Sequence, residues 1–294
     1  MKFLSTEQRG SLYAISSGLC YGFLGYFGVN LLNADLSIAN MLFWRFSIAT
    51  LFMLIILIPQ GKNIFRPFKE NLKVVFYGMA FYSTSAIAYF FGSNYIGTGL
   101  TMVVFFIYPA IVMLFNCILY KATISKMYYL AFSMIIVGVV LLADLSKLEC
   151  DFVGLGFGVL SAICYACYVV TSKKSNVPPM VSAFMLSIGC TITCLIVAYL
   201  ESSFFVPHHL NSWVDIVAMA VICTALPIIL LLHGLKYINS EKASMLSVLE
   251  PVFVLIFGII LLGETVSIMQ IIGTITVLSG AIITLFSNNA VNQK

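Results

Sequence analysis

The chain has 294 residues, of which 61% are hydrophobic and 9% are charged, and its mean hydropathy is +1.06. Soluble domains carry about 25% charged residues, so the composition excludes a soluble domain and predicts a polytopic membrane protein. The net charge of +4 therefore does not indicate nucleic-acid binding.

A helix needs roughly 20 apolar residues to cross a bilayer, and ten such segments follow one another with short connections. They cover residues 11–32, 37–58, 73–92, 98–119, 127–143, 153–172, 179–200, 213–233, 241–262 and 268–287. The segments are continuously apolar rather than alternating, which argues against a β-barrel. We predict an all-α membrane protein with ten transmembrane helices.

The basic residues predict the orientation of this bundle. With the N-terminus in the cytoplasm, the cytoplasmic side holds Lys2, Arg9, Lys62, Arg66, Lys69, Lys73, Lys121, Lys126, Lys173, Lys174, Lys236, Lys242 and Lys294. The other side holds one basic residue, Lys147, and the acidic residues Asp35, Asp144, Glu149, Asp151, Glu201, Asp215 and Glu264. Cytoplasmic loops are enriched in Lys and Arg, so we expect both termini in the cytoplasm and a multi-pass protein of the inner (plasma) membrane.

An internal repeat divides the chain into two halves, 1–146 and 147–294. At a shift of about 142 residues, "NYIGTGLTMVVFFIYPAIVMLF" from Asn94 aligns with "KYINSEKASMLSVLEPVFVLIF" from Lys236, and Pro109 falls on Pro251. Five helices is an odd number, so the second half enters the membrane from the opposite side. Inverted repeats of this kind are typical of secondary transporters, in which the binding site lies near the midplane and access alternates.

Several stretches resemble the EamA family of the drug/metabolite transporter superfamily. The segment "YINSEKASMLSVLEPVFVLIFGIILLGETVSIMQIIGTITVLSGAII" from Tyr237 is similar to the family's second-repeat signature, and "FWRFSIATLFML" from Phe43 resembles its second-helix Arg-Phe motif. The resemblance implies ten helices around a central cavity lined by helices 1, 3, 4, 6, 8 and 9. It implies no single solute, since members carry amino acids, nucleobases, cofactors, sugars or lipophilic cations.

Two charged residues, Arg45 and Glu250, are predicted to lie deep within the spans. A charge there costs a few kcal/mol and usually faces the protein interior or a cavity. Three hypotheses remain for Glu250: a proton or cation site, a group that binds a substrate amine, or a structural anchor bonded to a neighbouring helix or to Arg45. Arg45 itself is interpreted as a structural charge. The first half has Tyr108 where the second has Glu250.

Three prolines are candidate hinges. Pro109 and Pro251 occupy equivalent central positions, and Pro227 adds a break in the eighth span. Each proline lacks an amide donor and crowds the carbonyl four residues earlier, which for the first two belongs to Phe105 and Ser247.

Deep tyrosines predict a cavity that stacks flat or amphipathic solutes and offers hydroxyl groups, because a buried hydroxyl needs a partner. The candidate cavity residues are Tyr21, Tyr82, Tyr89, Tyr108, Tyr165, Ser247 and Glu250. Packing against lipid or protein is the competing interpretation of the tyrosines.

The sequence carries no HExxH, GxSxG or phosphate-binding glycine loop, so we expect no enzyme, no cofactor, no metal site and no use of ATP. The favoured function is secondary transport of a small amphipathic metabolite, such as an amino acid or a nucleobase- or vitamin-like compound. The alternatives are a broad drug efflux pump and a non-transporting scaffold. The expected partners are a small-molecule solute and the lipid bilayer, without nucleic acid. The sequence leaves the oligomeric state open and favours a monomer.

Overall fold

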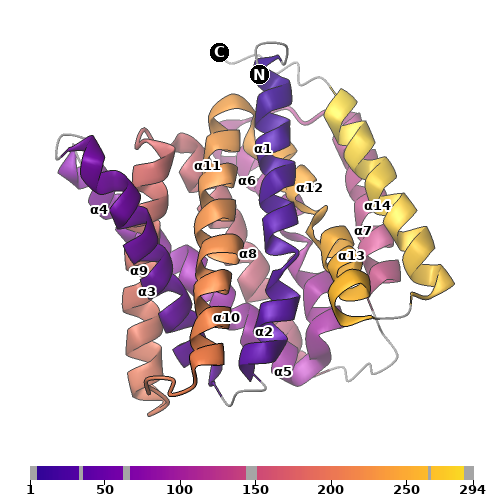
Figure 1. Cartoon of the computed structure of the whole chain (residues 1–294). Coiled ribbons are helices and arrows are strands. Elements are labelled where there is room, and N and C mark those ends of the chain that lie inside the picture. The colour runs from indigo at the N-terminus through magenta and orange to yellow at the C-terminus, as the bar shows by residue number, and fades with distance from the viewer. Residues whose placement is uncertain (1–4, 33–35, 62–66, 144–150, 264–265, 288–294) are drawn as a thin grey trace.

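A computed structural model describes residues 5–32, 36–61, 67–143, 151–263 and 266–287. The described residues contain helices and no strand (Figure 1). The α-helices are α1 (Thr6–Tyr21), α2 (Leu24–Leu32), α3 (Ile38–Leu57), α4 (Phe68–Tyr77), α5 (Ser83–Phe105), α6 (Tyr108–Tyr120), α7 (Lys126–Leu142), α8 (Phe152–Lys174), α9 (Pro179–Leu200), α10 (Leu210–Ala220), α11 (Leu226–Tyr237), α12 (Ser240–Ser247), α13 (Glu250–Leu262) and α14 (Ile268–Phe286). A 3-10 turn, η1 (Ile58–Gln60), follows α3, and the π-helical turns η3 (Gly78–Tyr82) and η4 (Val221–Ala225) join α4 to α5 and α10 to α11.

The helices form a bundle with two ends. We call the end where α1 begins and α14 ends the proximal face, and the opposite end, where α2 ends, the distal face (Figure 1). The junction between the two predicted halves, at residues 146 and 147, lies outside the described residues, as do several of the charges used to predict the orientation: Lys2, Asp35, Lys62, Arg66, Asp144, Lys147, Glu149, Glu264 and Lys294.

Seven helical stretches of the described residues, some of which join two or three of these elements, are long and apolar enough to cross a membrane. Two of the remaining predicted segments correspond to shorter apolar helices, α6 and α7, and the first is divided between α1 and α2. The all-helical membrane fold is thus confirmed, and the count of ten spans stays a prediction.

The two central prolines break their spans instead of kinking them. α5 ends at Phe105 and α12 ends at Ser247, the residues whose carbonyls the sequence placed against Pro109 and Pro251. Each proline then lies in the first turn of the next helix, where a missing amide costs no hydrogen bond. Each of the two central prolines therefore marks a helix end followed by a helix start.

Contacts between helices recur in pairs that differ by 142 to 144 residues. Ser17 on α1 donates from its hydroxyl to the carbonyl of Pro227 on α11, at 2.8 Å. Ser161 on α8 donates in the same way to the carbonyl of Ser85 on α5, also at 2.8 Å. The two π-helical turns are related by a similar shift, which places each of them in the middle of a long helix.

Glycines set the closest helix contacts, and they too occur in pairs. A Cβ at Gly10 would lie 2.8 Å from side-chain atoms of Tyr237 and Ile238, and one at Gly154 would lie 2.6 Å from those of Tyr95 and Ile96. Small residues at such positions let helices approach closely in a membrane. On the periphery, α7 and α14 pack through Gly138, Gly273 and Gly280 in the same manner.

The packing role of Gly154 is testable against a neighbour on the same helix. Gly154→Ala forces a methyl group into atoms 2.6 Å away, whereas Gly156→Ala meets nothing within 4 Å. Overpacking typically costs about 1–3 kcal/mol, so we expect Gly154→Ala to lower the thermal unfolding midpoint of the purified protein in detergent. Gly156→Ala should leave the midpoint unchanged or raise it, because alanine favours helix over glycine. Equal midpoints for the two variants would contradict this role.

Candidate functional site

A central cavity of about 620 Å³ lies between the helices that carry the predicted site residues. Its walls come from α1, α2, α3, η3, α5, α7, α8 and α13. The rim contains residues 94 and 97–100 of α5, together with Gly28 and Gly258, and it lies toward the distal face. The cavity is therefore a pocket that enters the bundle from the distal side.

Tyrosines line the deep wall of this cavity. Tyr21, Tyr82, Tyr89 and Tyr165 all border it. The hydroxyls of Tyr21 and Tyr82 share a hydrogen bond of 2.7 Å, and the rings of Tyr82 and Tyr165 lie 6.0 Å apart. This wall offers aromatic faces together with hydroxyl groups, which suits a solute with a flat or apolar part and a polar part.

Arg45 is held by the π-helical turn η4. Its Nε donates to Thr224 Oγ1 at 2.6 Å, and its Nη2 donates to the carbonyl of Cys223 at 3.0 Å. The guanidinium also lies 5.3 Å from the ring centroid of Phe46. Arg45 is 3% exposed and borders the cavity, so it joins α3 to η4 while contributing positive charge to the cavity wall.

Glu250 borders the same cavity at the start of α13. Among the described residues it forms no ion pair within 4.0 Å, with Arg45 or with any other base. The suggested Arg45–Glu250 pair is therefore not formed. The Glu250 carboxylate therefore borders a cavity that is large enough for a solute. The Arg45 guanidinium borders the same cavity at another place in its wall.

Not every predicted cavity residue reaches the cavity. Tyr108 lies behind the wall, where its hydroxyl donates to the carbonyl of Ser244 at 3.0 Å and its ring packs 4.8 Å from that of Tyr165. Ser247, Pro109, Pro251 and Pro227 are also absent from the lining. Of these five residues, Tyr108 supports the wall from behind through its contact with Tyr165.

Sequence reasoning missed two buried charges at the start of α12. Glu241 is 5% exposed and Lys242 is 2% exposed, and both lie at a helix start rather than deep within a span. The sequence analysis assigned Lys242 to the cytoplasmic side and did not predict that either side chain is buried. The sequence places Glu241 and Lys242 at the start of an apolar segment, and only the packing of neighbouring helices, α1 and α14 for Lys242, shows that they are covered.

The cavity also contains polar residues that the sequence analysis did not assign to the site. Ser85, Ser93 and Asn94 line it from α5. Tyr168 lies behind Tyr82, at a ring distance of 4.9 Å. The sequence signal that could have identified Tyr168 is its spacing. Tyr168 follows the candidate Tyr165 by about one helical turn, so both lie on the same face of the helix.

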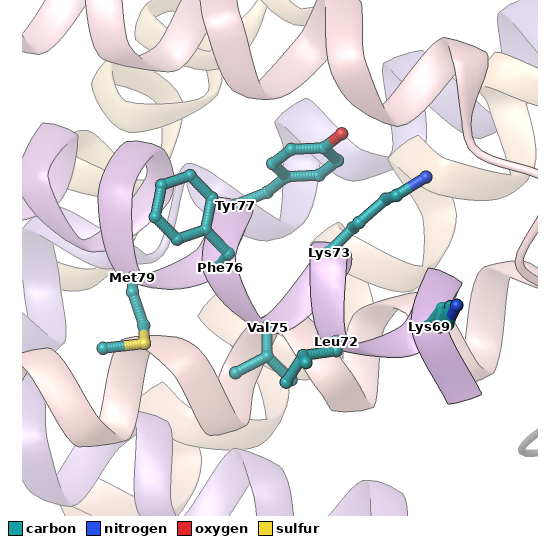
Figure 2. Close-up of a pocket in the computed structure, with 7 residues that line it drawn as sticks. All are labelled: Lys69, Leu72, Lys73, Val75, Phe76, Tyr77 and Met79. Carbon is teal, nitrogen blue, oxygen red and sulfur yellow. The ribbon is translucent and has the colours of Figure 1, made fainter.

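A second hollow, of about 450 Å³, runs along the outside of α4 and continues to Met79 of η3 (Figure 2). Leu72 and Phe76 in its lining are 57% and 59% exposed. Apart from Lys69 and Lys73 at one end, it is apolar. An exposed apolar groove on a peripheral helix is what acyl chains of a bilayer cover, so the central cavity is the candidate site.

The central cavity has the chemistry of a binding site. The described residues contain no group of three or more His, Cys, Asp or Glu side chains that could hold a metal ion. The lining offers one carboxylate, one guanidinium, hydroxyls and aromatic rings. Such a wall can bind and orient a solute and exchange a proton at Glu250.

These features define a helical membrane protein with a central solute-sized cavity. The sequence model of the EamA-like transporter family matches residues 8–143 and 152–286. The chain belongs to this family, which confirms the resemblance seen in the sequence, and it is a multi-pass membrane protein.

Curated relatives carry the same general description. An uncharacterized transporter of Archaeoglobus fulgidus is 30% identical over 133 residues, which is 44% of this chain. An uncharacterized transporter of Clostridium kluyveri is 24% identical over 149 residues, which is 49% of this chain. Each match spans 47% of the relative's own length.

A solved crystal structure has the same fold. It superposes with a TM-score of 0.82, covers 93% of this chain and 95% of its own, and is 16% identical in sequence. At that identity the likeness concerns the fold alone.

The attachment of Arg45 to η4 can be tested by removing one hydroxyl. Thr224→Val keeps the shape and deletes the acceptor of the Arg45 Nε–H bond. We expect a loss of about 1–2 kcal/mol of stability, because the bond is charge-assisted and buried. Thr284→Val is the control, since the buried Thr284 hydroxyl bonds only to Gly280 of its own helix. Equal thermal unfolding midpoints in detergent for the two variants would show that the Arg45 contact contributes nothing.

Proposed function

We propose that this protein transports a small amphipathic solute across the membrane by exposing the central cavity alternately at its two faces. The observation that carries this proposal is the cavity of about 620 Å³ that combines Glu250 and Arg45 with a wall of tyrosines. Membership of a transporter family supports it. Ionisable residues within membrane segments commonly mark the path of a solute or proton.

The paired contacts support an organisation in two inverted five-helix halves. The Ser17–Pro227 bond has its counterpart in Ser161–Ser85. In the two contacts, the first helix of one half bonds to the third helix of the other. Exchange of equivalent contacts across a pseudo-twofold axis is expected when two halves rock against each other around a central site.

The charges favour a cytoplasmic proximal face. Three lysines form hydrogen bonds at helix ends on this face: Lys173 to the end of α11, Lys236 to the residue after α8, and Lys242 to the start of α1 and the end of α14. At the opposite helix ends are Asp151 and Glu201. This distribution follows the rule that basic residues stay inside, and it supports our proposal that the open mouth of the cavity faces the outside of the cell.

The solute we propose carries both a flat or apolar part and a basic or zwitterionic part. Glu250 has no ionic partner among the described residues, so a cationic group of a solute can occupy its side of the cavity. The rings of Tyr21, Tyr82 and Tyr165 offer stacking and cation–π contacts. Amino acids and nucleobase- or vitamin-like compounds with an amine meet this description.

Transport through the cavity is tested by filling it. Ala86 is part of the lining, so the indole of Ala86→Trp should obstruct the cavity and reduce solute flux at least tenfold. Leu114→Trp, at a site that is 54% exposed on α6, is the matched control and should leave flux unchanged. The measurement is uptake into liposomes that contain the purified protein, with solutes chosen by a metabolite comparison of cells with and without the gene. Undiminished flux through Ala86→Trp would contradict the proposed path.

The proton role of Glu250 is tested by Glu250→Gln, which keeps the shape of the side chain and removes the ionisable group. If Glu250 carries the coupled proton, a pH gradient should drive accumulation in the wild type and fail to drive it in the variant. Exchange of solute without a gradient should continue at a reduced rate, because the variant also loses the charge that attracts a cationic group of the solute. Glu70→Gln, on the surface of α4, is the control. Unchanged gradient-driven accumulation in Glu250→Gln would eliminate Glu250 as the proton site.

A further inference from the structure

The proximal end of the cavity is closed by α12. All eight residues of this helix, Ser240–Ser247, are buried. At a shift of 142 residues their counterparts are residues 98–105, of which two, Thr101 and Val104, are buried. Thr98, Leu100 and Phe105 of this segment line the open cavity. Equivalent segments of the two halves thus occupy opposite situations, one forming a plug and the other an open wall.

Lys242 fastens the plug to two other helices. Its Nζ donates to Glu7 Oε1 on α1 at 2.6 Å and to the carbonyl of Leu285 near the end of α14 at 2.8 Å. A buried ammonium group is destabilising unless it is paired and hydrogen-bonded, and Lys242 is 2% exposed. Both bonds therefore depend on α12 staying between α1 and α14.

Two further lysines close the same face. Lys173 Nζ on α8 donates to the carbonyls of Leu235 and Ile238, at 2.7 and 2.9 Å. Lys236 Nζ donates in return to the carbonyl of Ser175, at 2.8 Å. These carbonyls lie at helix ends and lack partners within their helices, so the lysines join α8 to the end of α11.

The distal mouth has no counterpart of these ties among the described residues. The residue equivalent to Lys242 is Leu100, and the residue equivalent to Lys236 is Asn94. Leu100 and Asn94 both line the open cavity. At a shift of 144 residues, Asp151 is equivalent to Glu7. Its Oδ1 accepts from the backbone amides of Val153 and Gly154 and caps α8. Within the described part of the chain, the ionic closure is therefore found in one half only.

We propose that the Lys242–Glu7 ion pair is a latch on the proximal gate, which biases the protein toward the state that is open at the distal face. The proposal rests on the alternating access of the proposed function. When the latch releases, α12 leaves α1 and Lys242 enters water at the proximal mouth. Lys242 then has the position at the proximal mouth that its equivalent, Leu100, has at the distal mouth in this structure. Residues 98–105 then pack as Ser240–Ser247 do here.

The test is amide hydrogen exchange of the full chain in lipid nanodiscs, which needs no known solute. Glu7→Gln removes the charge of the partner whose side chain is 51% exposed, so the fold is retained. We expect exchange in residues 240–247 to become roughly tenfold faster, the effect of replacing one charge-assisted hydrogen bond with a weaker neutral one. Exchange in residues 98–105 should become slower in the same variant.

Lys242→Leu gives the proximal gate the residue type of the distal one, and it should produce the same reciprocal change. Glu70→Gln breaks the Lys73–Glu70 pair on exposed α4 and should change neither segment. Faster exchange confined to residues 240–247 would indicate local loosening and overturn the latch, as would no change in Glu7→Gln. If hydrogen exchange changes in opposite directions in the two segments but liposomes show no solute flux, the latch is supported and the proposed transport is refuted. If liposomes show flux but the two segments do not change in opposite directions, transport is supported and the latch is refuted.

Discussion

The structure depends on how an apolar chain satisfies its backbone where a proline interrupts a helix inside a membrane. A free amide or carbonyl in hydrocarbon costs several kcal/mol, so irregular backbone survives only where protein or water provides partners. At both central breaks the chain makes a tight turn, in which the amides of Ile107 and Leu249 donate to the carbonyls of Val104 and Leu246, at 3.3 and 3.2 Å. The second break is buried at Val248 and Leu249, whereas at the first break Ile107 is 39% exposed and Phe106 lines the cavity. Proline position thus decides where the two halves change direction around the site.

Much of this arrangement could be predicted from the sequence, because it follows from local rules. Hydropathy predicts the helices, and the missing amides of Pro109 and Pro251 predict interrupted hydrogen bonding at Phe105 and Ser247. The sequence did not distinguish a kinked helix from two helices. That difference depends on whether neighbouring groups can satisfy the freed carbonyls, as Tyr108 does for Ser244.

The partners of charged residues could not be predicted, because they come from distant parts of the chain. Arg45 bonds to Cys223 and Thr224, which the fold brings near it through the π-helical turn η4. The sequence assigned Lys242 only to the cytoplasmic side, and its bonds to Glu7 and Leu285 became visible only in the fold. Hydropathy and spacing describe one helix at a time, and these contacts arise only when helices from both ends of the sequence meet.

The two halves share a packing scheme but differ in charge, and the differences lie where function requires them. Tyr108 can donate its hydroxyl proton to a carbonyl permanently, whereas a carboxyl group in the equivalent place, Glu250, can do so only when protonated. The substitution converts a fixed support into a group whose bonding depends on a proton. At the gates, Lys242 replaces Leu100 and adds one ion pair. An ion pair between a buried and a half-exposed residue has a modest net free energy, because each charge regains water when it separates. A closure of that strength can hold one state and still release, since a few kcal/mol are enough to shift a two-state population strongly.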